Sequence, residues 1–143
     1  AHVAHDCVVG NDNVFANNSG IAGHVTVGNN VTIGALTTIH QFCQMGDYSF
    51  AGMNASITMD VPSYIKVASN PARVVGLNSV GMERGGIDHE TITILKKAYK
   101  IIYRKGFNLK DAIEKVESIE SSNVQEVRNF IDSIKSSERG ILR

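Results

Sequence analysis

The 143-residue sequence is poor in the features that mark secreted, membrane-spanning and nucleic-acid-binding proteins. It has two cysteines and no tryptophan, and its 14 basic and 14 acidic side chains give a formal net charge of zero. No apolar run approaches the ~20 residues that a membrane-spanning helix needs. Residues 1–75 carry two basic and four acidic side chains, so neither half has the basic excess of a nucleic-acid binder. We therefore expect a cytoplasmic protein with no membrane span and no nucleic-acid partner.

What the sequence does contain is a six-residue repeat from Val3 to Ile57. Every sixth residue is apolar: Val3, Val9, Phe15, Ile21, Val27, Ile33, Ile39, Met45, Ala51 and Ile57. The next residue is glycine or alanine throughout, except at His40 and Thr58. A helix repeats its apolar face near 3.6 residues and a simple strand near 2, so a sustained period of six indicates short strands joined by tight corners. The repeat predicts a parallel β-helix.

The coil geometry follows from this period. Three six-residue strands would make one coil, and the repeated apolar side chain would stack inside the helix at ~4.8 Å per coil. Pairs such as Asn17-Asn18 fall at the corners, where asparagine tolerates a positive φ. Cys7 and Cys43 lie two coils apart, about 9.6 Å at that rise and beyond the ~7 Å limit for a disulfide. We expect both thiols to be reduced, buried and inert, which agrees with a cytoplasmic location.

The sequence divides at about residue 75. Residues 1–75 are predicted to form the β-helix, and residues 76–143 a small α-helical domain. The repeat is already in phase at Val3, so we expect a fragment whose N-terminal coils are missing.

The C-terminal part changes from the six-residue period to a helical one. Residues 81–86 are expected to form a turn, and a helix should begin at the N-cap Asp88 and end at Gly106. Further helices are predicted from residue 108 or 109 to about 119, and from Asn123, where Asn123 and Glu126 resemble a capping box. The first helix carries five cations, which form either a solvated face or a docking surface for an acidic protein: Lys96, Lys97, Lys100, Arg104 and Lys105.

Four of the five histidines lie in the first 40 residues. In an 18-residue coil, His5, Gly23 and Gln41 form one corner column, and Asp6, His24 and Phe42 form the next. We expect His5, Asp6, His24 and Gln41 to cluster on one outer edge. Histidine can act as a general base near neutral pH, and a neighbouring carboxylate would orient its ring. The Gly23 amide could then face a developing oxyanion.

Several short motifs agree in order and spacing with one enzyme family. They are His2-Val-Ala-His5-Asp6-Cys7, Ala16-Asn17-Asn18, Ala22-Gly23-His24-Val25, His40-Gln41-Phe42-Cys43, Asp60-Val61-Pro62, the stretch from Asn78 to Arg84 and the ending Arg139-Gly140-Ile141-Leu142-Arg143. Together they resemble the UDP-N-acetylglucosamine O-acyltransferases of lipid A biosynthesis. The match covers the whole chain and corresponds to about the C-terminal half of that family.

The resemblance implies a left-handed parallel β-helix and a homotrimer with active sites between neighbouring subunits. It implies that His5 is the general base, that Asp6 orients it, and that the Gly23 amide serves the oxyanion. The donor would be a (R)-3-hydroxyacyl thioester of acyl carrier protein, and the acceptor the 3-hydroxyl of UDP-N-acetylglucosamine. No cofactor or metal is implied.

The resemblance also implies a set of substrate-binding residues. His2, His24, His40 and Gln41 would position substrate, Met53 would limit the length of the acyl chain, and Asn78 and Arg84 would contact the nucleotide and its phosphates. The sequence departs from the family pattern at Val80, where a glutamate can occur, and at Gly85, where a second arginine can occur.

Three alternatives stay open. The γ-type carbonic anhydrases share the fold and bind zinc through histidines, and His2-x-x-His5 invites the comparison. Three histidine ligands would be needed, however, and the paired histidines five apart of that family are absent. A hexapeptide scaffold without activity is the second alternative, and an N-acyltransferase of the same pathway, whose acceptor is an amine, is the third.

Overall fold

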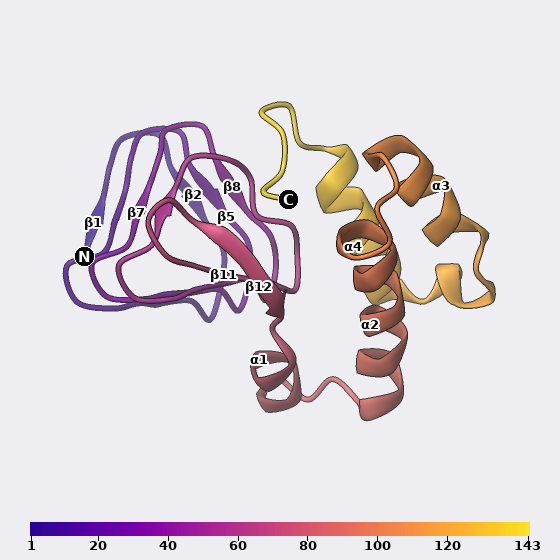
Figure 1. The fold of residues 1–143 in the computed structure, drawn as a ribbon. Coiled ribbons are helices and arrows are strands. Elements are labelled where there is room, and N and C mark those ends of the chain that lie inside the picture. The colour runs from indigo at the N-terminus through magenta and orange to yellow at the C-terminus, as the bar shows by residue number, and fades with distance from the viewer.

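A computed structural model describes residues 1–143 and confirms the parallel β-helix followed by helices (Figure 1). Ten strands of two residues each make up the repeat: β1 (His2–Val3), β2 (Val8–Val9), β3 (Val14–Phe15), β4 (Gly20–Ile21), β5 (Thr26–Val27), β6 (Thr32–Ile33), β7 (Thr38–Ile39), β8 (Gln44–Met45), β9 (Phe50–Ala51) and β10 (Ser56–Ile57). They belong to three parallel sheets, in the orders β1-β4-β7-β10, β2-β5-β8 and β3-β6-β9. The sheets form the three faces of a prism.

The register between coils is 18 residues. His2 pairs with Gly20, and Gly20 pairs with Thr38 in the next coil. The backbone bonds between coils follow the same spacing, as when Gly10 donates to the carbonyl of Val27 and Gly28 to that of Met45, both at 2.8 Å. Residues 18 apart in the sequence are therefore neighbours in space.

Each corner contains one residue with a left-handed backbone. From Asp6 to Asn54 every sixth residue has a φ between 57° and 66°. The expected Asn18 is among them, but so are residues that seldom adopt this conformation, such as Leu36 and Tyr48. This conformation costs roughly 1–2 kcal/mol for a residue with a Cβ, so closure of the coil overrides local preference here.

The interior is the expected column of apolar side chains. Ile21, Ile33 and Ile39 are at most 2% exposed. Val3 and Val9 are the corresponding inward residues of the first coil but are 51% and 41% exposed, because their coil has a neighbouring coil on one side only. Burial thus increases along the prism from β1 towards β10.

The second inward column holds small polar residues and the two cysteines. Ser19 and Thr37 are buried, and their hydroxyls donate to backbone carbonyls. Both cysteines are free, as expected, and burial raises the pKa of the Cys43 thiol to about 11. Cys7 is only half-buried, so the expectation that both thiols are buried is wrong for Cys7, which lies in the first coil.

The prism ends in an antiparallel hairpin. Strand β11 (Ile65–Ala68) joins the β3-β6-β9 sheet beside β9, and β12 (Arg73–Leu77) pairs with β11. Helix α1 (Ser79–Arg84) follows, and the Asn78 side chain accepts a hydrogen bond from the Gly81 amide at its start. The turn expected over residues 81–86 is therefore wrong for residues 81–84, which belong to this short helix, and is confirmed only at residues 85 and 86.

Three longer helices complete the chain: α2 (His89–Tyr103), α3 (Leu109–Ser118) and α4 (Gln125–Lys135), with a short 3-10 turn, η1 (Glu120–Asn123), before α4. The predicted N-cap Asp88 is confirmed, since its side chain accepts from the Thr91 amide. The predicted capping box is wrong. Helix α4 begins after Val124 with no side-chain cap, because Asn123 belongs to η1. None of the helices combines the length and apolarity that a bilayer crossing requires.

The C-terminal tail lies between the β-helix and the helices (Figure 1). Asp60 joins the two: its amide donates to the Gly140 carbonyl, and its carbonyl accepts from the Leu142 amide. Its carboxylate accepts from the Gln44 amide at 2.7 Å and from the Ser137 hydroxyl at 2.6 Å. Strand β12 continues past residue 75 to Leu77, and a domain boundary at that residue stays a prediction.

We predict that Ile33→Ala lowers the free energy of unfolding by about 2–5 kcal/mol, since it leaves a cavity in the stacked column. Thr32→Ala, in the same strand with an outward side chain, is the matched control and should change stability by at most about 0.5 kcal/mol. Urea denaturation of the three proteins measures the difference. Equal effects from the two substitutions would contradict the assignment of Ile33 to the core.

Candidate active site

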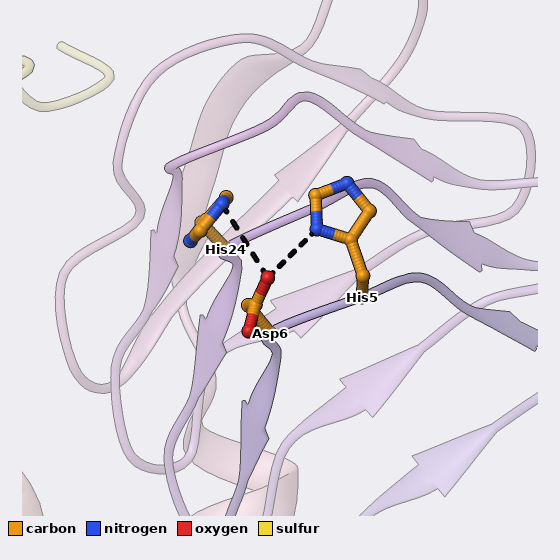
Figure 2. Close-up of side chains that lie close together, drawn as sticks. All are labelled: His5, Asp6 and His24. Atoms are coloured by element: carbon orange, nitrogen blue, oxygen red, sulfur yellow. Dashed lines mark hydrogen bonds and ion pairs between the residues drawn. The ribbon is translucent and has the colours of Figure 1, made fainter.

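His5, Asp6 and His24 come together on one corner of the prism, as expected. Figure 2 shows both imidazole rings directed at the Asp6 carboxylate. Oδ2 of Asp6 lies 2.9 Å from Nδ1 of His5 and 3.7 Å from Nε2 of His24. The two histidine rings meet edge to face, with centroids 5.2 Å apart. One carboxylate oxygen therefore serves two histidines.

The coil geometry creates this arrangement. Asp6 and His24 are the left-handed residues of successive coils, with φ of 58° and 59°. The His24 amide donates to the His5 carbonyl at 3.0 Å, which fixes the two coils against each other at this corner. His24 thus lies one coil above Asp6 by the register of the whole prism.

The charge of Asp6 decides which nitrogen of His5 carries the proton. The hydrogen bond from His5, followed by the charge of His24, holds the pKa of the Asp6 carboxyl below its ordinary value. An ionised carboxylate can only accept hydrogen bonds, so Nδ1 of His5 is the donor. The lone pair of His5 is then on Nε2, which is free to take a proton from a bound ligand.

Gly23 lies directly above the His5 ring. A Cβ at this position would come within 2.7 Å of Cε1 and Nε2 of His5, so the ring occupies the space that a side chain would need. The Gly23 amide donates no hydrogen bond within the chain. At the next corner the equivalent amides, of Asn11 and Asn29, are bound by the side chains of Asn29 and Asp47. The His5 corner thus leaves a donor free for a ligand.

Phe42 is a member of the cluster to which the sequence analysis gave no role. Its ring stacks on His24, with centroids 4.6 Å apart and planes 8° from parallel. The sequence signal for this contact is the 18-residue spacing between His24 and Phe42, which places the two residues one above the other on adjacent coils. The stack holds the His24 ring in the plane that directs Nε2 at Asp6.

His2, His40 and Gln41 lie near this corner but do not join the cluster. His2 is in β1, and His40 follows β7 in the same sheet; all three side chains are exposed. None of them makes a hydrogen bond or ion pair with His5, Asp6 or His24. Gln41 lies one coil above Gly23 on this corner, where the Phe42 amide donates to the Gly23 carbonyl at 3.1 Å, and its place within reach of a common ligand stays a prediction.

Met53 is 72% exposed on a different corner from His5. It follows β9 in the β3-β6-β9 sheet, whereas His5 follows β1. The two residues lie at different edges of the prism. A ligand could contact both residues of one chain only by extending across a face of the prism. Otherwise it would contact His5 of one copy of the chain and Met53 of another.

Asn78 and Arg84 differ in their surroundings. Asn78 is 7% exposed, its Nδ2 donates to the Tyr48 carbonyl at 2.7 Å, and its Oδ1 accepts from the Gly81 amide. Arg84 lines a cavity of about 510 Å³ beside α1, together with Phe50 and Lys66. Arg84 thus faces this cavity, whereas Asn78 is nearly buried and already bonded within the chain through both its Nδ2 and its Oδ1.

The departure at Gly85 has a structural reason. A Cβ there would lie 2.5 Å from the ring of Tyr48. Tyr48 is itself stacked on Tyr64, with centroids 5.9 Å apart. A side chain at position 85 is excluded while Tyr48 keeps this position.

Comparison with known proteins agrees with this geometry. A family described as "Udp N-acetylglucosamine O-acyltransferase; Domain 2" matches residues 60–142, and the bacterial transferase hexapeptide family matches residues 6–41. The chain belongs to the UDP-N-acetylglucosamine O-acyltransferase family. The repeat by itself occurs in many hexapeptide proteins. The match of residues 60–142, which include the helices, distinguishes this family from the others.

Its relatives come from several bacteria and a plant. The chain is 42% identical over its whole length to the acyl-(acyl-carrier-protein)–UDP-N-acetylglucosamine O-acyltransferase of Ectopseudomonas mendocina, and covers 55% of that protein. The crystal structure of the Moraxella catarrhalis enzyme matches 96% of this chain with a TM-score of 0.91 and 42% identity, and 53% of that enzyme is covered. The crystal structure of the Arabidopsis enzyme matches with a TM-score of 0.92 and 33% identity, and the match covers 96% of this chain and 51% of that enzyme. The chain spans about half the length of the relatives it matches.

We predict that Gly23→Ala displaces the His5 ring from its 2.9 Å contact with Asp6. The ring is the mobile end of an exposed side chain, so the free energy of unfolding should change by at most about 1 kcal/mol. Crystal structures and urea denaturation measure the two effects. Gly20→Ala is the control, because its Cβ would meet nothing closer than 3.9 Å. An unmoved His5 in Gly23→Ala would contradict the prediction.

Proposed function

We propose that the chain is part of an O-acyltransferase that moves a (R)-3-hydroxyacyl chain from acyl carrier protein to the 3-hydroxyl of UDP-N-acetylglucosamine, the first step of lipid A biosynthesis. The observation that carries the proposal is the Asp6–His5 pair, at 2.9 Å, beneath the free amide of Gly23. A base with an oriented ring and a nearby backbone donor suit acyl transfer to a hydroxyl. Membership of the family supports the choice of substrates.

Each group has one role in the proposed reaction. Nε2 of His5 takes the proton of the 3-hydroxyl as that oxygen attacks the thioester carbonyl. The Gly23 amide binds the oxyanion of the tetrahedral intermediate. When the intermediate collapses, the C–S bond breaks and the His5 imidazolium returns its proton to the departing thiolate. The Asp6 carboxylate stabilises the imidazolium between these two steps.

The thiols of the chain play no part in this reaction. Cys43 is fully buried, and burial raises the pKa of its thiol to about 11. The thiol of Cys7 points at the Ala22 carbonyl, 3.1 Å away. A direct transfer from donor to acceptor, without an acyl-cysteine, therefore fits the chain better than a covalent route.

The wider assembly belongs to the same proposal. We infer a left-handed β-helix and a homotrimer in which the His5 corner of one subunit faces a neighbour. The placement of Met53 and His5 on different edges supports a site shared between subunits. His2, His24, His40 and Gln41 would position substrate, and Arg84 and Asn78 would contact the nucleotide. The free cysteines support a cytoplasmic location.

We predict that His5→Ala in the full-length protein lowers kcat by at least about 100-fold, because the general base is lost. The fold should persist, since the side chain is 73% exposed. His89→Ala, an exposed residue at the start of α2, is the control and should keep full activity. Assays with UDP-N-acetylglucosamine and with the corresponding 3-amino sugar distinguish O-acylation from N-acylation. Near-normal turnover of His5→Ala would show that His5 is not the general base.

Helix α2 carries the proposed docking surface for acyl carrier protein. Lys96, Lys97 and Lys100 are exposed and form no ion pair within the chain. Nε of Arg104 donates to the Tyr99 hydroxyl at 3.4 Å, which holds its guanidinium at the end of the row beside Lys105. A row of unpaired cations attracts an acidic partner.

We predict that reversing the charge of Lys96, Lys97 and Lys100 to glutamate raises KM for the acyl carrier protein donor and leaves KM for the sugar nucleotide unchanged. The effect should shrink as salt is added, because screening weakens attraction between exposed charges. Lys110 and Lys115 on α3 provide the control positions. A change confined to the sugar nucleotide would show that the surface is misassigned.

We predict that the protein prefers donors of about ten to twelve carbons and that Met53→Gly extends the preference towards fourteen. Each methylene that the methionine excludes forfeits ~0.8 kcal/mol of burial, so two to four carbons correspond to roughly 15-fold to 200-fold in kcat/KM. Relative kcat/KM for donors of ten to sixteen carbons measures this preference. A wild-type preference for fourteen or longer, unchanged in Met53→Gly, would exclude a length-setting role for Met53.

A further inference from the structure

The His5 corner also has the composition of a metal site. One donor atom from each of His5, Asp6 and His24 lies within 4.8 Å of the other two. Oδ2 of Asp6 faces both rings, at 2.9 and 3.7 Å, and Figure 2 shows it between them. Two imidazoles and one carboxylate converge on a single small volume.

These distances suit a transition metal. Donors around a tetrahedral zinc ion, at bond lengths of about 2.0–2.2 Å, are separated by about 3.3 Å. The two distances to Asp6 lie on either side of that value, and all three donor atoms lie within 4.8 Å of one another. Imidazole with carboxylate favours Zn²⁺ and its neighbours over Mg²⁺ or Ca²⁺, which prefer oxygen ligands alone.

The backbone holds these donors close together without a ligand. Asp6 and His24 occupy equivalent left-handed positions of adjacent coils, and Phe42 stacks on the face of His24. In the single chain the three side chains are also open to solvent, with His5 73%, Asp6 67% and His24 43% exposed. An ion can therefore enter, and water can complete its coordination.

We propose that His5, Asp6 and His24 form a binding site for a divalent transition-metal ion such as Zn²⁺, and that the bound ion inhibits the protein reversibly. The site is distinct from a zinc cofactor site, because the same three side chains serve the proposed reaction in their metal-free form. The inhibition, though not the binding, rests on the proposed function.

The mechanism of inhibition follows from the tautomer of His5. Without metal, Nδ1 of His5 donates its proton to Asp6 and the lone pair is on Nε2. If Nδ1 gives a lone pair to the ion, the ring proton must move to Nε2. Nε2 then becomes a donor and can no longer accept the proton of a hydroxyl. If Nε2 binds the ion instead, its lone pair is occupied, so either mode removes the base.

Binding is tested with Zn²⁺ by isothermal titration calorimetry, and with Co²⁺ by the visible absorption of the bound ion. Four proteins are compared: the unsubstituted protein, His24→Ala, Asp6→Asn and the control His89→Ala. The protein and His89→Ala should bind one equivalent with the same affinity. His24→Ala and Asp6→Asn should bind at least about tenfold more weakly, since changes even beyond the ligands cost about 10–100-fold in metal affinity.

Two results would overturn the site: no Zn²⁺ binding by the protein, or equal affinity in all four proteins. Retention of the fold by His24→Ala and Asp6→Asn is checked by circular dichroism. If either variant is unfolded, His24→Gln and Asp6→Ala replace it in the same titration.

Inhibition is tested separately on acyl transfer by the full-length protein. Zn²⁺ should lower turnover at the concentration that saturates the site, and a chelator should restore it. Binding without inhibition in an active enzyme would overturn the inhibitory role. Zn²⁺ binding by a protein with no acyl-transfer activity would instead refute the proposed function and leave the metal site standing.

Discussion

Stacking of an 18-residue coil on its copies is the constraint on which the rest of the structure depends. Ile21 and Ile39 illustrate it, because they pair directly across adjacent coils and both are almost completely buried. The gain from this column outweighs a recurrent local cost. Residues as unsuited to a left-handed backbone as Leu36 and Phe42 adopt it, with φ of 60° and 66°, because they occupy the corner positions of their coils.

The same register assembles the candidate active site. His5 and Asp6 are neighbours in sequence, but the 3.7 Å approach of His24 and the free Gly23 amide come from the coil above. A single carboxylate then orients two imidazoles, and its own negative charge is stabilised by them. This sharing makes the corner suitable both for proton transfer and for binding a transition-metal ion. The two cannot occur at the same time, because a bound ion would occupy or reprotonate the nitrogen that accepts the proton.

The helical part is attached to the prism through a few buried polar residues. Asp60 is 3% exposed and binds the tail through both its backbone and its carboxylate. The Ser133 hydroxyl of α4 accepts from the Ser63 amide, and Asn129 donates to the Tyr64 hydroxyl. Burial raises the pKa of Tyr64 to about 12, so this phenol stays neutral over the physiological range. These bonds fix α4 against the last coil.

The sequence by itself determined the parallel β-helix, its 18-residue register and the pairing of His24 with Asp6, because a strict period places residues in space without further information. It also predicted α2 and α3 from their apolar stripes and caps. It did not predict helix α1, which begins with the Asn78 side chain on the Gly81 amide, or the start of α4, which has no side-chain cap. Tertiary structure alone decided that Phe42 stacks on His24 and that Tyr48 excludes a side chain at Gly85. The period gives the position of each corner residue, whereas the direction of its side chain depends on neighbours brought close only by folding.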